Sequence, residues 1–224
     1  MIKLVVFDLW QTLIPATIDF VHMASLLNQE KLSLTDFIPR YEKATQLKKY
    51  KSFEQLRKDF FEEFKEYDNK LLEQELYEIY FNRLDHIHFY PEVKKTLIKL
   101  RKEGYKLALL SNTESLMSKY IEDKLKLKSL FDLVVLSYET GAIKPDKKAF
   151  EFVLKKMKVK PNEALMVGDS LRSDIIGSRN VGMNNCLINR LGYVLDDAKA
   201  KPDFTVKGLA EVSYVLGVLN ANSK

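Results

Sequence analysis

The chain has 224 residues, of which 46% are hydrophobic and 30% are charged, with only eight glycines and six prolines. This composition is typical of an ordinary folded protein and excludes a disordered or fibrous one. The length allows either one large domain or a core domain with a smaller insertion.

The formal charge of +5 comes from lysines scattered through predicted helices, without clustered arginines. We therefore expect a solvated, lysine-rich surface and no nucleic-acid partner. No apolar run approaches the roughly 20 residues that a membrane span needs, and the N-terminus MIKLVVFDLW lacks a signal-peptide cleavage pattern. We expect a cytoplasmic protein without a membrane partner, present as a monomer or a homodimer.

The first predicted strand covers residues 3–7, a short apolar run that ends on Asp8. A nearly continuous apolar run is typical of a strand that is buried on both faces of a parallel sheet. Asp8 is therefore expected at the C-terminal end of this strand.

The pattern changes to helical spacing between residues 15 and 88. Apolar residues recur there with charged residues between them, as in the series Phe53, Leu56, Phe60 and Phe64. We predict a helical cap domain over 15–88, inserted after the first strand, and a core domain formed by 1–14 and 89–224. Such an insertion would lie over the Asp8 end of the sheet, in the position of a lid.

The rest of the chain alternates apolar runs with helical patterns. The further runs cover residues 107–110, 133–136, 164–167 and 186–188. Strand and helix in alternation predict a parallel sheet, and so an α/β fold with a Rossmann-like three-layer core. Cys186 falls in the last of these runs, where we expect a buried structural thiol.

Parallel sheets of this kind bind ligands outside the carboxyl ends of their strands. The residues just after each apolar run are therefore the candidates for chemistry. This rule selects Asp8, Ser111, Lys144 and Asp169.

Four motifs at these positions resemble those of the haloacid dehalogenase superfamily. The stretch DLWQTL that begins at Asp8 resembles the first motif, whose leading aspartate attacks the substrate. Ser111 and Asn112 resemble the second, where a hydroxyl and a neighbouring group hold the phosphoryl oxygens. Lys144 resembles the lysine of the third motif, which offsets the charge shared by nucleophile and phosphate.

The fourth motif is GDS at residues 168–170, followed by Asp174. It resembles the family's carboxylates for magnesium, an ion that prefers hard oxygen ligands. The resemblance covers about residues 1–14 and 89–220, whereas the helical insertion matches the family only in its placement and type. It implies a core of the haloacid dehalogenase type with a helical cap.

The resemblance also implies a mechanism, in which Asp8 forms a covalent aspartyl-phosphate that water then hydrolyses. It implies a magnesium ion held by Asp8, Asp169, Asp174 and the backbone carbonyl of Trp10. It implies a phosphoryl group bound by Ser111, Asn112 and Lys144.

The chain departs from the pattern at Trp10. Phosphatases of this superfamily usually carry a second aspartate there, which protonates the leaving alcohol and then activates water. An indole cannot exchange a proton near neutral pH. General acid-base assistance is typically a factor of roughly 10² to 10⁴ in rate, so its loss matters most for esters with poor leaving groups.

Three hypotheses follow, of which we favour a magnesium-dependent phosphatase of phosphorylated small molecules. Such an enzyme would act slowly, act on activated acyl or aryl phosphates, or recruit a base from the lid. The histidines available for that role are His22, His86 and His88, although a lone histidine in a helical segment is more often a surface or packing residue.

The second hypothesis is a 2-haloacid dehalogenase, because that branch has an aromatic residue at the position of Trp10 and needs neither proton nor metal. Asp169 and Asp174 argue against it, while Arg40 lies in the region of the arginine that receives halide. The third hypothesis is a binding protein on a retired enzyme scaffold. The retention of Asp8 together with the other motif residues argues against that.

Overall fold

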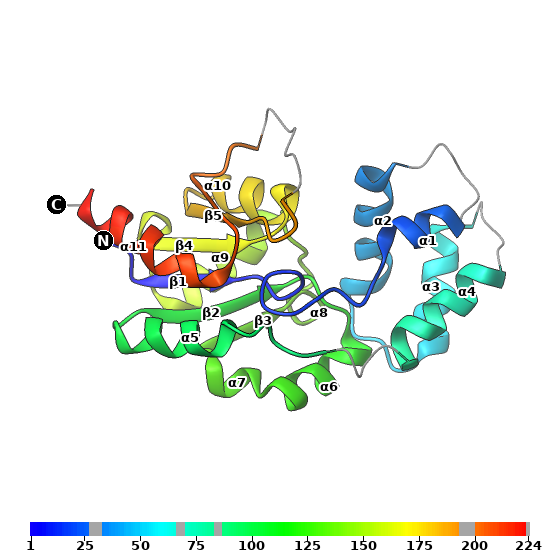
Figure 1. Cartoon of the computed structure of the whole chain (residues 1–224). Helices are drawn as coiled ribbons and strands as arrows, with labels where there is room; N and C mark the ends of the chain where they lie inside the picture. The colour runs from blue at the N-terminus through cyan, green and yellow to red at the C-terminus, as the bar shows by residue number, and fades with distance from the viewer. Residues whose placement is uncertain (27–32, 66–69, 83–86, 193–199, 223–224) are drawn as a thin grey trace.

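A computed structural model of the chain describes residues 1–26, 33–65, 70–82, 87–192 and 200–222 (Figure 1). Within these residues a sheet of six strands forms the centre of the molecule. Its strands are β1 (Leu4–Phe7), β2 (Lys106–Ser111), β3 (Leu133–Leu136), β4 (Ala164–Gly168), β5 (Asn184–Ile188) and β6 (Phe204–Val206).

The strand order is β3-β2-β1-β4-β5-β6, and every neighbouring pair is parallel. The predicted parallel α/β fold is therefore confirmed. The chain leaves β1 toward one edge and returns to the other side of β1 with β4, which creates a topological switch point between these two strands. Phe7 pairs with both Leu109 and Val167, so the central strands end close to the same level.

Helices cover both faces of the sheet. They are α5 (Val93–Lys102), α6 (Ser115–Leu125), α7 (Leu127–Leu130), α8 (Ser137–Thr140), α9 (Lys147–Met157), α10 (Gly177–Arg179) and α11 (Val212–Ala221), with the 3-10 helices η3 (Pro161–Glu163) and η5 (Leu209–Glu211) and the π-helix η4 (Leu171–Ile176). Leu4 and Val6 pack on the side of α9, whereas Val5 and Phe7 pack on the opposite side. This two-sided burial explains why β1 is apolar at every position.

The described residues between β1 and α5 are largely helical, as the sequence predicts. It contains α1 (Phe20–Leu26), α2 (Leu34–Gln46), α3 (Phe53–Glu63), α4 (Lys70–Tyr77) and η1 (Glu78–Asn82). Figure 1 shows α1 to α4 gathered beyond the carboxyl ends of the strands, while both termini lie at the opposite end of the sheet. These helices are called the insertion helices below.

Serine side chains cap the N-termini of two of the insertion helices. The Ser33 hydroxyl accepts a hydrogen bond from the Asp36 N–H at the start of α2, and the Ser52 hydroxyl accepts one from the Gln55 N–H at the start of α3. Such caps satisfy backbone donors that the first helical turn leaves unpaired.

Cys186 is buried in β5, as predicted for a structural thiol, and burial raises the pKa of its thiol to about 12. None of the described helices combines the length and the apolar character that a bilayer crossing requires.

The insertion helices have an aromatic core of their own, centred on Phe60. This ring stacks on Phe64 with 4.7 Å between centroids and meets Tyr41 edge-on at 6.0 Å. All three side chains are fully buried.

Replacing Phe60 with alanine should therefore lower the free energy of unfolding by about 3–5 kcal/mol, because it removes a large buried ring and leaves a cavity. Urea unfolding followed by circular dichroism measures this change. Phe152→Ala, at a partly exposed position on α9, is the matched control and should cost much less. Equal losses in the two variants would contradict the aromatic core.

Candidate active site

Asp8 is the first residue after β1. Its backbone N–H donates to the Val167 carbonyl at 2.9 Å, which continues the β1–β4 pairing for one more residue and holds the Asp8 backbone in place. The residue is only 6% exposed. Asp8 is thus held at the switch point of the sheet, where ligands of such folds bind.

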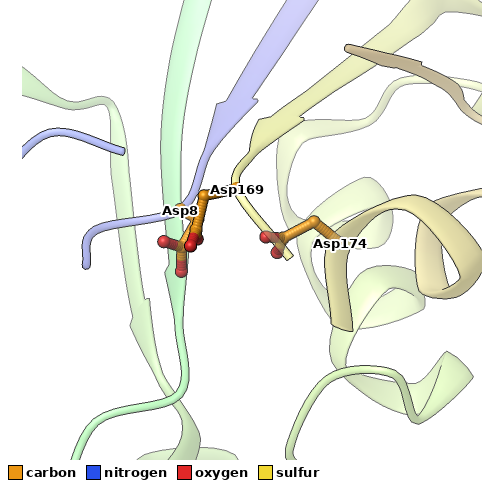
Figure 2. Close-up of side chains that lie close together, drawn as sticks. All are labelled: Asp8, Asp169 and Asp174. Atoms are coloured by element: carbon orange, nitrogen blue, oxygen red, sulfur yellow. The ribbon is translucent and has the colours of Figure 1, made fainter. Parts of the chain in front are cut away.

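Two more carboxylates converge on Asp8 from the β4 side. Asp169 follows β4 directly and Asp174 lies in η4, and one oxygen of each of the three groups lies within 4.8 Å of the others (Figure 2). The Ser170 N–H donates to Asp174 Oδ2 at 3.0 Å. A Cβ atom at Gly168 would overlap the Asp174 carboxylate, so only glycine permits this close approach of backbone and side chain.

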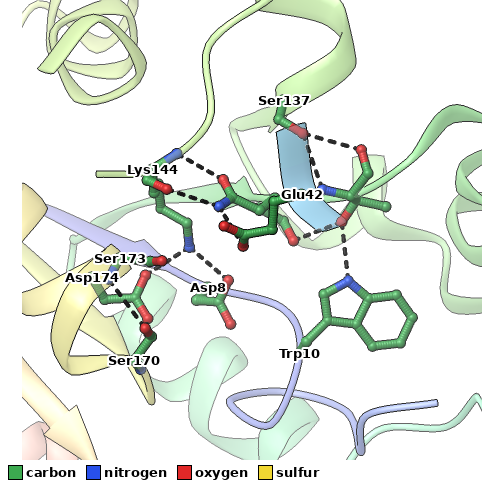
Figure 3. A network of polar contacts seen from close by, with 11 residues as sticks. Asp8, Trp10, Glu42, Ser137, Lys144, Ser170, Ser173 and Asp174 are labelled. Carbon is green, nitrogen blue, oxygen red and sulfur yellow. Dashed lines mark hydrogen bonds and ion pairs between the residues drawn. The ribbon is translucent and has the colours of Figure 1, made fainter. Parts of the chain in front are cut away.

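The Lys144 ammonium lies between two of these carboxylates. Its Nζ atom is 2.6 Å from Asp8 Oδ1 and 2.6 Å from Asp174 Oδ1, and the residue is 1% exposed (Figure 3). Charge-assisted hydrogen bonds of this length are among the strong ones in proteins. The ammonium therefore links the residue that follows β1 to η4.

Asn112 holds the backbone of Lys144 in place. Its Oδ1 atom accepts from the Lys144 N–H at 2.8 Å, and its Nδ2 donates to the Lys144 carbonyl at 3.0 Å. The position of the lysine therefore depends on the residue that follows β2. A direct contact of Asn112 with phosphate stays a prediction.

The site carries more negative than positive charge. Burial raises the pKa of Asp8 to about 6. The attraction of Lys144 opposes this rise, and the repulsion of Asp174 adds to it. Burial and the repulsion of Asp8 and Asp174 also raise the pKa of Asp169 well above its ordinary value. Burial alone would lower the pKa of Lys144, but the attraction of the carboxylates outweighs it and raises that pKa.

This excess of negative charge fits a divalent cation. Among the described residues, these three carboxylates lie beside one ammonium, that of Lys144, and hard oxygen donors are what magnesium prefers. A bound magnesium ion would neutralise the charge that burial and mutual repulsion penalise here. The donors would be Asp8, Asp169 and Asp174.

Ser111 and Trp10 are linked through Thr113. The Ser111 and Thr113 hydroxyls are 2.7 Å apart, and the Trp10 indole N–H donates to Thr113 Oγ1 at 3.2 Å (Figure 3). Ser111 is fully buried and is not among the described residues that line the cavity. Its contact with phosphate, and that of the Trp10 carbonyl with a metal, stay predictions.

A cavity of about 250 Å³ opens beside Asp8. On one side it is lined by the polar residues of the strand ends, including Lys144 and Asn112. On the other side apolar and aromatic residues, mainly from the insertion, form the wall: Trp10, Ala16, Ile18, Phe20 and Ile38. A ligand with its charged group at Asp8 would thus contact apolar surface with its remaining part.

Glu42 is a cavity residue that the sequence analysis missed. It projects from α2, is 8% exposed, and accepts a hydrogen bond from Asn112 Nδ2 at 2.9 Å (Figure 3). Its neighbours at four-residue spacing, Ile38 and Gln46, line the cavity as well. Residues four apart share one helix face, so this spacing was the available signal.

The side chains that the sequence offered as a candidate base or halide receptor are not among the described residues that line the cavity. His22 is half exposed with Nε2 3.7 Å from Glu75, and His88 is exposed. Neither is among the described residues that line the cavity, and His86 lies outside the described residues. Arg40 donates to Glu63 and lies 4.5 Å over the Phe64 ring, away from the described lining of the cavity.

Comparison with known proteins agrees with this geometry. The family model described as haloacid dehalogenase-like hydrolase matches residues 2–182. The chain belongs to this family.

Curated relatives within the family are named as phosphatases. A glyceraldehyde 3-phosphate phosphatase of Pyrococcus furiosus is 35% identical over 136 residues, which cover 60% of this chain and 57% of the relative. A phosphoserine phosphatase of Thermus thermophilus is 35% identical over 139 residues, which cover 62% and 55%. The matched part of the chain thus spans little more than half the length of these relatives.

Solved structures of the family include both phosphatases and dehalogenases. A phosphatase of Thermococcus onnurineus shares 28% identity at a TM-score of 0.65, covering 96% of this chain and 98% of that one. A 2-haloacid dehalogenase of Pseudomonas syringae shares 25% identity at a TM-score of 0.65, covering 97% and 99%. The overall fold therefore does not separate the two activities.

Replacing Lys144 with methionine should destabilise the metal-free protein by about 3–5 kcal/mol, because it leaves buried carboxylates without their cation. The pKa values of Asp8 and Asp169, already raised in the wild type, then rise further, so stability is lost as pH rises and these carboxylates ionise. Urea unfolding in chelator should show a larger deficit at about pH 8 than at about pH 5. The exposed Lys148→Met is the control, and a deficit independent of pH would contradict the electrostatic account.

Proposed function

We propose that the protein is a magnesium-dependent phosphatase of small molecules that forms an aspartyl-phosphate on Asp8. The observation that carries this proposal is the buried cluster in which Asp8 lies beside Lys144, Asp169 and Asp174. A nucleophile, a cation and further carboxylates for a metal are the groups that phosphoryl transfer to an aspartate requires. The phosphatase names of the curated relatives support the same assignment.

Attack by Asp8 brings a carboxylate toward a phosphate dianion, and like charges repel each other. The Lys144 ammonium, already in contact with Asp8, offsets part of this charge. Magnesium, held by Asp8, Asp169 and Asp174, would supply further neutralisation of the phosphoryl oxygens. In the first step a bond forms between an Asp8 oxygen and phosphorus while the bond from phosphorus to the leaving oxygen breaks.

The insertion helices would act as the cap domain of this enzyme, with 15–88 as its extent. Their cavity-facing side chains exclude water from the reacting phosphoryl group and contact the rest of the substrate. Ile18, Phe20 and Ile38 favour a leaving group with apolar surface. A cytoplasmic location and a monomeric or homodimeric state stay predictions.

Two observations favour phosphatase over dehalogenase activity. Arg40, the candidate halide receptor, is engaged with Glu63 and Phe64 instead of lining the cavity. Asp169 and Asp174 lie beside Asp8 as donors for a metal ion, which a 2-haloacid dehalogenase does not need.

The decisive assay uses the purified protein on aryl, alkyl and acyl phosphates and on 2-chloropropionate. Phosphate release is expected in magnesium, a fall to background in chelator, and recovery when magnesium is restored. Colorimetric phosphate and halide determinations measure the two activities side by side. Release of halide in chelator, without release of phosphate, would contradict the proposal.

Replacing Asp8 with asparagine should lower turnover by at least about 10³-fold, because the amide cannot form the covalent intermediate. The substitution keeps the size of the side chain, so the circular dichroism spectrum should be unchanged. Asp123→Asn, at an exposed position on α6, should keep full activity. Residual turnover in an Asp8→Asn preparation free of wild-type enzyme would refute Asp8 as the nucleophile.

A further inference from the structure

A phosphatase with Trp10 at the position of the usual acid lacks a proton donor for the leaving alcohol. The indole N–H already donates a hydrogen bond to Thr113 Oγ1. An indole also does not give up its proton near neutral pH. Alkyl phosphates need such a donor because an alkoxide is a poor leaving group. Another cavity residue must supply the proton if these esters are substrates.

We propose that Glu42, from the insertion helix α2, is the general acid and base of this enzyme. This inference rests on the proposed phosphatase function and adds a catalytic residue to it. Glu42 lines the same cavity as Asp8 and Lys144, and it is more than nine-tenths buried (Figure 3).

The two carboxyl oxygens of Glu42 have different surroundings. Oε1 accepts the hydrogen bond from Asn112 Nδ2, which orients the carboxyl group toward the strand ends. Oε2 is buried without a hydrogen-bond partner among the described residues, and Arg172 Nη1 is 3.8 Å from it. A buried polar atom without a partner is costly, and a leaving oxygen or a water in the cavity would provide one.

The protonation state of Glu42 suits both halves of the reaction. Burial raises the pKa of Glu42 to about 7. The Asn112 hydrogen bond and the charges of Arg172 and Lys144 oppose this rise, and the charge of Asp174 adds to it. Both forms of the carboxyl group are therefore populated near neutral pH. An acid-base catalyst works best when its pKa lies near the working pH.

In the first step Asp8 attacks phosphorus, and the bond from phosphorus to the leaving oxygen breaks. That oxygen keeps the electron pair and takes the proton of the Glu42 carboxyl group, which gives a neutral alcohol and a Glu42 carboxylate. In the second step this carboxylate removes a proton from water as the water oxygen attacks phosphorus. The bond from phosphorus to Asp8 then breaks, which releases phosphate and regenerates both carboxyl groups in their starting states.

The contacts of Glu42 also fit a purely positioning role, in which Glu42 holds Asn112 and Asn112 holds Lys144. The experiment must separate this role from acid-base catalysis. Glutamine separates these roles, because its carbonyl oxygen still accepts from Asn112 but it neither donates nor takes up a proton as a carboxyl group does. The variant Glu42→Gln also keeps the size of the side chain.

The test compares kcat/KM of wild type and Glu42→Gln on benzyl phosphate and on 4-nitrophenyl phosphate, in magnesium. Both substrates carry one aromatic ring, but the alcohol of the first is far less acidic. The variant should lose roughly 10² to 10⁴ in kcat/KM on benzyl phosphate and only a few-fold on 4-nitrophenyl phosphate. Because water activation is impaired too, rapid mixing with 4-nitrophenyl phosphate should give a burst of nitrophenolate and an accumulated phosphoryl-enzyme, detected by intact mass.

The pH profile of the wild type is a second readout that needs no variant. On benzyl phosphate kcat/KM should fall as pH rises through about 7, because the protonated form of Glu42 is lost. This limb should be absent on 4-nitrophenyl phosphate. Arg172, Lys144 and Asp174 are the charged groups that face Glu42 from the core, and they are the same with both substrates.

The exposed substitution Glu62→Gln on α3 is the matched control and should leave both activities unchanged. Equal kcat/KM of Glu42→Gln and wild type on benzyl phosphate would overturn the role of Glu42, as would an equal loss on both substrates, which indicates positioning of Asn112. In either case the phosphatase proposal stands. A wild-type enzyme that releases no phosphate from aryl, alkyl or acyl phosphates overturns both proposals.

Discussion

The site depends on one buried ammonium. Lys144 contacts Asp8 and Asp174 at the point where the chain crosses from one side of the sheet to the other. Without a cation these carboxylates could not remain ionised together in a buried position. Because the ammonium balances only part of their charge, the cluster retains a net attraction for a divalent metal. A divalent metal bound there would offset this negative charge and allow a phosphoryl group to approach Asp8.

Asn112 connects this charge cluster to the insertion. The Asn112 side-chain amide forms hydrogen bonds with the N–H and the carbonyl of Lys144 and with the Glu42 carboxyl group of α2. Lys144 and the insertion therefore share one hydrogen-bond network, and a movement of α2 away from the sheet must break the contact between Glu42 and Asn112. This arrangement makes completion of the proposed site depend on closure of the insertion over the strand ends.

The activity of this family member rests on side chains around a common fold. Solved phosphatase and dehalogenase structures match the chain equally well in their overall shape, so fold alone does not choose between the two reactions. Trp10 is compatible with both. The choice depends on the side chains of the site, where the carboxylates of Asp169 and Asp174 beside Asp8 suit a metal ion that phosphoryl transfer uses and dehalogenation does not need.

Sequence alone determined the parallel sheet and the helical insertion, because apolar periodicity reports directly which faces of a strand or helix are buried. It also indicated that Asp8, Lys144 and Asp169 would meet, since parallel strands bring their carboxyl ends to one edge. Only the tertiary structure decided which insertion residue faces them. The four-residue spacing of Ile38, Glu42 and Gln46 indicates one shared helix face. Burial of that face against the strand ends is a long-range contact that the local pattern does not encode. The same packing decided that Arg40, the candidate halide receptor, and His22, a candidate base, contact other residues of the insertion.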